Sequence, residues 1–160
     1  MNQLILAIIL TILPISELRG GMPIAINYAL KNNLSIFPVF LMILSFNILV
    51  IFLIFIFLDF FHKRLMKIRL YKKMFDFYIK NVLRKKVYKF QGKYSSYGFL
   101  ALALFVGIPL PATGAWTGTI LAWFLGLERK KSIIAISFGV LIAAIIMLLA
   151  SLGFIHFFIK

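Results

Sequence analysis

The sequence predicts an all-α integral membrane protein, a single membrane domain over residues 1–160 with two inverted repeats. Each repeat is expected to be a re-entrant helical hairpin followed by a full transmembrane helix, and a basic interfacial helix joins the two. Of the 160 residues, 63% are hydrophobic and 14% are charged, whereas soluble domains have about 45–50% apolar and about 25% charged residues. The order of apolar and Pro/Gly-rich segments also occurs twice. Disordered chains, disulfide scaffolds and soluble enzymes are thereby excluded.

The first hairpin is expected over residues 1–31. Residues 2–13 are apolar up to Pro14, a break extends to Pro23, and a second apolar piece covers residues 24–30. Twelve helical residues rise only about 18 Å, roughly half of a 30 Å hydrocarbon core. The pattern therefore predicts a half-helix, a break and a returning half-helix. No Lys or Arg precedes the apolar run, so we expect no cleavable signal peptide.

A full transmembrane helix is expected over residues 36–58, followed by a basic amphipathic segment over residues 62–93. Twelve of the 18 Lys and Arg residues lie in this segment, and its apolar residues recur at helical spacing. Such a helix lies in the headgroup plane and binds anionic lipids rather than nucleic acid. The residues expected to contact lipid headgroups are Lys72, Lys73, Lys85 and Lys86.

The second repeat is expected to comprise a hairpin over residues 97–127 and a transmembrane helix over residues 132–158. Its break extends from Gly107 to Gly118. Each repeat crosses the membrane once, so the second must be inverted relative to the first. Inverted repeats with broken helices that meet near the midplane are typical of secondary transporters.

Four ordinary spans, two of them kinked at proline, are the alternative topology. Opposed hairpins put 15 basic residues on one side and leave only Lys31 and Lys160 on the other, whereas four spans divide them 13 to four. The sharper asymmetry favours hairpins. Both topologies place the basic loop in the cytoplasm, and we expect a multi-pass protein of the plasma membrane.

Glu17 and Arg19 in the first break are the strongest candidates for function. A charged side chain at membrane depth costs about 2.5–3.5 kcal/mol or more. Glu17 could bind a coupling proton, and Arg19 offers a planar fork for phosphate or carboxylate. The alternative is that the two residues simply pair and cap the hairpin. Gly20, Gly21 and Pro23 complete this candidate site.

The second break is neutral, and it opens a half-helix whose N-terminal dipole could hold an anionic group. The alternatives are close helix packing at Gly114 and Gly118, and an interfacial anchor at Trp116. The candidate residues here are Pro109, Pro111, Thr113, Gly114, Trp116, Thr117 and Gly118.

Other polar residues carry weaker expectations. Asp59 is expected to cap the first full span, and His62 and His156 to lie at the membrane interface. Asn47 could face a cavity or pack across helices. The chain has no Cys, and its histidines lack metal-ligand spacing to an acid, so we expect no metal and no cofactor.

The two breaks resemble the motifs of a known family. The segment Ser16–Pro23 resembles the Glu-Leu-Arg-Gly-x-x-Pro signature of the small multidrug export proteins, and Pro109–Gly118 resembles their second motif. That family is similar to the DedA superfamily, whose members have two opposed re-entrant loops and are implicated in the translocation of lipids or lipid carriers. The resemblance implies a transporter-like protein whose acidic and arginine positions are Glu17 and Arg19. The second loop lacks the Arg or acid that many DedA proteins carry.

Together these features predict a secondary transporter or flippase and not an enzyme. Its substrate would be a small amphipathic or anionic-headed molecule (a lipid, lipid carrier or drug-like compound), coupled to protons through Glu17. A non-transporting assembly or lipid-organising protein is the main alternative, and a passive channel is a third. Membrane lipids, the transported molecule and a second copy of the chain are the expected partners.

Overall fold

The computed structural model describes the chain except for residues 1–2, 68–71, 74–94, 111–112 and 159–160. The described part is all-helical. Its main helices are α1 (Gln3–Ile12), α2 (Glu17–Lys31), α3 (Ile36–Leu65), α6 (Ser95–Gly107), α7 (Ala115–Phe124) and α8 (Arg129–Phe158).

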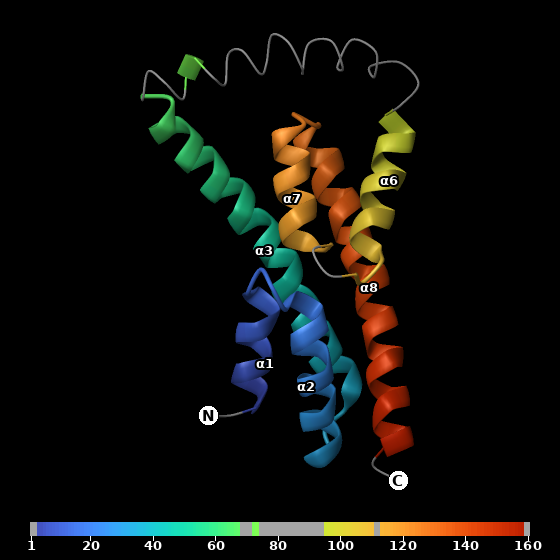
Figure 1. Ribbon diagram of the computed structural model, residues 1–160. Coiled ribbons are helices and arrows are strands. Elements are labelled where there is room, and N and C mark those ends of the chain that lie inside the picture. Colours follow the sequence, from blue (N-terminus) through green and yellow to red (C-terminus); the bar gives the residue numbers. More distant parts are fainter. Residues whose placement is uncertain (1–2, 68–71, 74–94, 111–112, 159–160) are drawn as a thin grey trace.

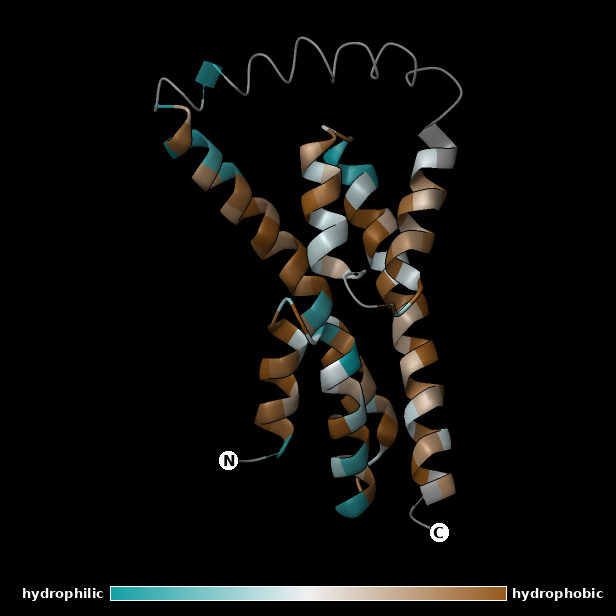
Figure 2. Ribbon diagram, viewed as in Figure 1, coloured by the Kyte–Doolittle hydropathy of each residue, from teal (hydrophilic) through white to brown (hydrophobic). Residues whose placement is uncertain are grey.

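Two of these helices, α3 and α8, are long and apolar enough to cross a membrane. Each has 30 residues, and 20 helical residues already span about 30 Å. Most residues along the helices are hydrophobic (Figure 2). The fold is therefore that of a helical membrane protein.

The other four helices form two hairpins that approach each other from opposite ends of the molecule (Figure 1). The pair α1–α2 comes from the end where α1 begins and α8 ends, and the pair α6–α7 comes from the other. The hairpin tips meet beside α3 and α8, about halfway along them. This arrangement places the two Pro/Gly-rich breaks against each other.

Both breaks are shorter than the sequence indicated. The first covers only residues 13–16, since α2 begins at Glu17 and contains Pro23. Proline has no N–H to donate, so the carbonyl of Arg19 loses its helical partner there, while the rest of the helix continues. The second break ends at Gly114, because α7 begins at Ala115.

The long helices also extend beyond their expected ranges. Helix α3 ends at Leu65, seven residues after the expected limit, and its last turn carries His62, Lys63 and Arg64. Basic side chains stabilise the carbonyl end of a helix through its dipole. This explains why α3 extends beyond the end of the apolar run. Helix α8 begins at Arg129, three residues before the expected start.

The connections from α2 to α3 and from α7 to α8 have the same form. In both, the long helix starts five positions after the short one ends. A residue with positive φ follows each short helix, Asn33 at 52° and Gly126 at 64°. Two backbone bonds of the Schellman type then close each helix, Leu34 N to Ala29 O (2.8 Å) with Asn33 N to Leu30 O (3.3 Å), and Leu127 N to Ala122 O (3.0 Å) with Gly126 N to Trp123 O (3.1 Å).

The expected basic helix over residues 62–93 falls largely outside the described residues, Lys85 and Lys86 included. Of the four lysines expected to bind lipid headgroups, Lys72 and Lys73 are described and are exposed to solvent.

Small residues bring the helices of the first hairpin close together. Ala7 and Gly21 are buried at the contact of α1 and α2. A methyl group added at Gly21 would collide with the Thr11 hydroxyl and lie 2.7 Å from the Ala7 carbonyl oxygen. Close backbone approach of this kind drives helix association in lipid, where apolar burial alone provides little.

We predict that Gly21→Ala destabilises the folded protein by about 1–3 kcal/mol, the usual cost of overpacking. Thermal melting of the detergent-purified protein measures this loss. Gly98→Ala and Gly153→Ala are matched controls, because a methyl group at either position meets nothing within 4 Å. Equal melting temperatures for all three variants would contradict the proposed packing role of Gly21.

Candidate functional site at the hairpin tips

Glu17 is the first residue of α2, and its carboxylate caps the N-terminus of α7. Its Oε2 accepts a hydrogen bond from the Ala115 amide (3.1 Å) and its Oε1 accepts one from the Trp116 amide (3.0 Å). Only 4% of the Glu17 surface is exposed. Amides in the first turn of a helix have no helical acceptor, so a carboxylate there satisfies two donors and also complements the helix dipole. The second hairpin is therefore capped by the first.

This cap requires unusual backbone at both ends. Glu17 has a φ of 45°, a left-handed conformation that is uncommon for a residue with a side chain and costs about 1–3 kcal/mol. Gly114 precedes α7 with a φ of 146°, and a Cβ atom added to it would collide with the Glu17 carboxylate. Gly114 is thus required by its conformation and by the space that the carboxylate occupies.

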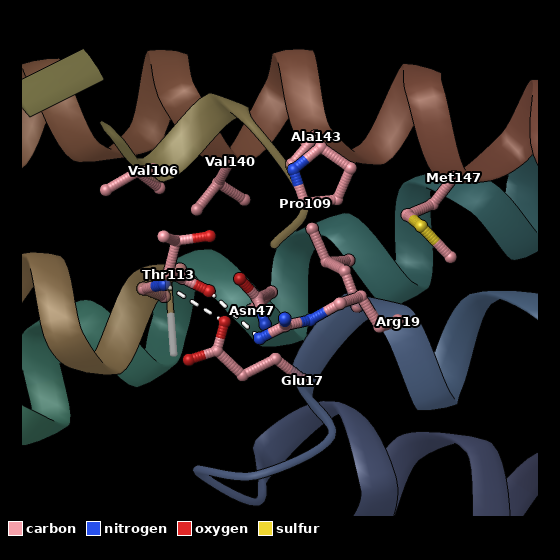
Figure 3. A pocket seen from close by; sticks show the side chains of 12 residues that line it. Glu17, Arg19, Asn47, Val106, Pro109, Thr113, Val140, Ala143 and Met147 are labelled. Atoms are coloured by element: carbon pink, nitrogen blue, oxygen red, sulfur yellow. Dashed lines mark hydrogen bonds between the residues drawn. The ribbon is translucent and has the colours of Figure 1, made fainter. Parts of the chain in front are cut away.

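Arg19 connects the hairpins a second time. Its guanidinium donates to the carbonyl oxygens of Leu110 and Thr113, the latter at 3.0 Å. The Thr113 hydroxyl accepts from the Leu110 amide (3.1 Å) and lies within donating distance of the Ile108 carbonyl oxygen (2.6 Å). These bonds satisfy loop carbonyls and fix the loop before α7 against α2 (Figure 3).

Trp116 adds a hydrogen bond in which the second hairpin donates to the first. Its indole Nε1 donates to the carbonyl oxygen of Ile12 at the end of α1, at 2.9 Å. Trp116 therefore lies where the tips meet and not at an outer end of the helices. In the described part of the chain no ion pair joins Glu17 and Arg19, and both side chains bond to the second hairpin instead.

A small pocket lies between the tips, and α3 and α8 also contribute to its lining (Figure 3). The space open to the centre of a water-sized sphere is about 10 Å³, room for about one water molecule. Five candidate residues from the sequence line this pocket, namely Glu17, Arg19, Pro109, Thr113 and Gly114.

The other candidates serve packing or lie elsewhere. Gly20 and Gly21 are on the side of α2 that faces Ser16 and α1, and Gly118 packs against Val106 of α6. Pro23 lies within α2, and the Thr117 hydroxyl donates to the Gly114 carbonyl of its own turn, at 3.5 Å. Pro111 is outside the described residues.

Asn47 of α3 belongs to the site as well. It is fully buried and lines the pocket, and its Nδ2 donates to the Thr11 carbonyl oxygen at 3.1 Å. Both interpretations of this residue are therefore correct, since it faces a cavity and also bonds across helices. Its position amid an apolar span was the signal in the sequence.

One known protein family matches most of the chain. The family described as "Putative small multi-drug export protein" matches residues 17–146, from the capping glutamate into α8. The chain belongs to that family. Searches of curated proteins and of solved structures found no match. Export proteins are generally not enzymes, and the two long apolar helices agree with a membrane location.

A second polar cluster in this family member joins α3 to α7 and to the first residue of α8. Asp59 accepts hydrogen bonds from Trp123 Nε1 (3.0 Å) and from Arg129 (2.7 Å), and the His62 ring meets the Trp123 ring edge-on. The expected cap role of Asp59 is wrong, because α3 continues for six residues beyond it. No local pattern identifies Trp123 as the partner of Asp59, since the two residues are 64 positions apart.

This cluster is a weaker candidate than the tip contact. The side chains of Arg129 and Asp59 are 50% and 40% exposed, and exposed ion pairs contribute about 0–1 kcal/mol. Among the described residues, no group of three or more His, Cys, Asp and Glu side chains could hold a metal ion.

We predict that Gly114→Ala destabilises the fold by at least about 2 kcal/mol, because it adds backbone strain and displaces the Glu17 cap. Thermal melting in detergent is the measurement. Gly107→Ala is the control, since its methyl group would make ordinary contacts of 3.4–3.5 Å with α8. A Gly114→Ala variant that melts with the control would show that the carboxylate does not need this space.

Proposed function

We propose that the protein is a proton-coupled secondary transporter or flippase, with Glu17 as the proton-binding group. Its substrate is a small amphipathic or anionic-headed molecule, such as a lipid, a lipid carrier or a drug-like compound. The observation that carries this proposal is the Glu17 carboxylate at the N-terminus of α7. One ionisable side chain thereby joins two hairpins that approach from opposite ends.

Protonation of Glu17 changes the strength of its hydrogen bonds to the first two amides of α7. Hydrogen bonds to a charged acceptor are roughly twice as strong as those to a neutral one. A proton on the carboxyl group therefore weakens both amide bonds and removes the favourable interaction with the α7 dipole. The tips can then separate, and deprotonation brings them together again.

Separation of the tips also makes a binding site. The closed pocket has room for about one water molecule, whereas sites for drug-sized ligands are about 300–1,000 Å³. In the closed state the Arg19 guanidinium is held by the carbonyls of Leu110 and Thr113. Once the loop moves away, the same planar fork can bind the phosphate or carboxylate of a substrate.

The proposal includes inverted repeats and re-entrant hairpins in the plasma membrane, as in the DedA superfamily. The matched connections after α2 and α7 support a repeat, as do the equal lengths of α3 and α8. The basic segment over residues 62–93 would then lie in the cytoplasm and bind anionic lipids.

The alternative is a non-transporting assembly or lipid-organising protein. It is favoured by one observation, namely that the tip contact already gives Glu17 and Arg19 hydrogen-bond partners. In that case the contact is permanent, and the basic segment carries the function.

We predict that Glu17→Gln abolishes coupled transport but leaves folded protein in the membrane. The assay follows NBD-labelled phosphatidylglycerol by dithionite quenching in proteoliposomes, with and without a pH gradient. The variant should lose the stimulation by the gradient, because glutamine cannot take up a proton. Glu128→Gln is the control, since Glu128 is exposed and pairs with Lys131 on the surface. Normal stimulation in Glu17→Gln would refute the role of Glu17.

The alternative function predicts the opposite dependence. Replacement of Lys72, Lys73, Lys85 and Lys86 by glutamine would then abolish function, measured as growth of a strain that depends on the gene, while Glu17→Gln would support normal growth.

Cysteine labelling tests the topology, because the native chain contains no Cys. Single cysteines at Lys31, Lys72 and Lys130 are treated with a membrane-impermeant thiol reagent from each side. Opposed hairpins predict that positions 72 and 130 label from the same side and position 31 from the other. Labelling of 31 and 130 from one side would show four kinked spans.

A further inference from the structure

Asn47 carries an acceptor that the described residues leave unpaired. Its Nδ2 donates a hydrogen bond to the Thr11 carbonyl oxygen at 3.1 Å. Its Oδ1 is buried, and no donor in the described part of the chain bonds to it. Buried amide oxygens nearly always have a partner, so an unpaired one beside a pocket that also contains a carboxylate and a guanidinium indicates a bound group that donates a hydrogen bond.

The pocket beside Asn47 has the size and polarity for such a group. Asn47, Glu17 and Arg19 line it, together with apolar walls from Val140 and Met147. The space is sufficient for about one water molecule. Each Glu17 oxygen accepts one backbone amide, and a carboxylate oxygen has a second lone pair available.

The charges around the pocket decide which kind of ligand fits. An anion would face the Asn47 oxygen and the Glu17 carboxylate, which are both acceptors. A metal cation would face the Arg19 guanidinium and would find few oxygen ligands among apolar walls. A neutral molecule that both donates and accepts satisfies all three polar groups.

We propose that this pocket binds one water molecule, which donates to Asn47 Oδ1 and to the Glu17 carboxylate and accepts from Arg19. The water gives the buried amide its missing donor and brings an exchangeable proton to the capping carboxylate. Asn47 is then a positioning residue, because it orients the water without touching the substrate.

The role of this water rests on the proposed proton coupling. An excess proton that reaches the water makes a hydronium ion, which passes a proton to a Glu17 oxygen and becomes neutral water again. The carboxylate becomes a neutral carboxyl group, and its two bonds to α7 weaken. The water would thus deliver the proton that releases the tips.

Radiolytic hydroxyl-radical labelling of the reconstituted full chain tests the water site directly, because radicals formed from bound water oxidise the side chains beside it. Met147 lines the pocket, while Met42 of α3 is partly buried and does not line it. We expect Met147 to be oxidised faster than Met42. Oxidation of Met147 no faster than Met42 would overturn the site.

Two variants test the same site in different ways. Asn47→Leu removes the acceptor at similar volume, and Ala143→Val fills the pocket without changing Asn47. Both should abolish the excess oxidation of Met147, while Asn47→Ser, which keeps an oxygen, should restore part of it. Unchanged Met147 oxidation in both Asn47→Leu and Ala143→Val would overturn the site. Thermal melting checks that each variant is folded.

The relay is measured separately as proton entry into proteoliposomes that contain the pH dye pyranine. Asn47→Leu should slow gradient-driven entry although Glu17 is intact, and Asn47→Ser should recover part of the rate. Unchanged proton entry together with lost Met147 labelling would overturn the relay and keep the water site. Normal coupled transport in Glu17→Gln would instead overturn the proposed function and leave the water site standing.

Discussion

The structure depends on one carboxylate placed at the start of another helix. Glu17 belongs to the first hairpin, yet the amides that it accepts belong to α7 in the second. In a membrane interior, each backbone donor without a partner costs on the order of several kcal/mol, as other polar groups do when they are buried in hydrocarbon. A helix that begins halfway through the molecule therefore needs an acceptor from elsewhere. The Ala115 and Trp116 amides of the second hairpin find their acceptor in the first, so the two hairpins must fold against each other.

The remaining polar contacts follow from the same constraint. Arg19 supplies donors to the loop carbonyls before α7, and Trp116 supplies a donor to the carbonyl end of α1. The first break thus receives a side-chain donor from the second hairpin, and the second break receives side-chain donors and acceptors from the first. The glycines fit this scheme because a side chain at Gly114 would occupy the space of the Glu17 carboxylate.

The contact between the Glu17 carboxylate and α7 depends on the charge of that carboxylate. Glu17 holds a left-handed backbone conformation, with φ of 45°, that its two side-chain bonds help to maintain. Protonation of the Glu17 carboxylate would leave its backbone strain unchanged and would weaken the two hydrogen bonds that offset this strain. Strained residues of this kind gather at sites that switch between states. In the second polar cluster the side chains of Arg129 and Asp59 are about half exposed, so their ion pair can re-form in water. The Glu17 carboxylate is buried, so its bonds to α7 have no such replacement.

Hydropathy and the Pro/Gly breaks alone determined that the chain is helical, apolar enough for a membrane and divided into short and long segments, because these properties depend on neighbouring residues. The same local reasoning singled out Glu17 and Arg19, since charge amid apolar sequence needs a partner. Local reasoning placed the end of the first break at Pro23, but α2 already begins at Glu17 and contains this proline. The helix tolerates Pro23 because the surrounding helices pack against α2. Only the tertiary structure decided what the charges do. The amides that Glu17 caps are 98 and 99 positions away in the chain, and no local pattern encodes a bond over that separation.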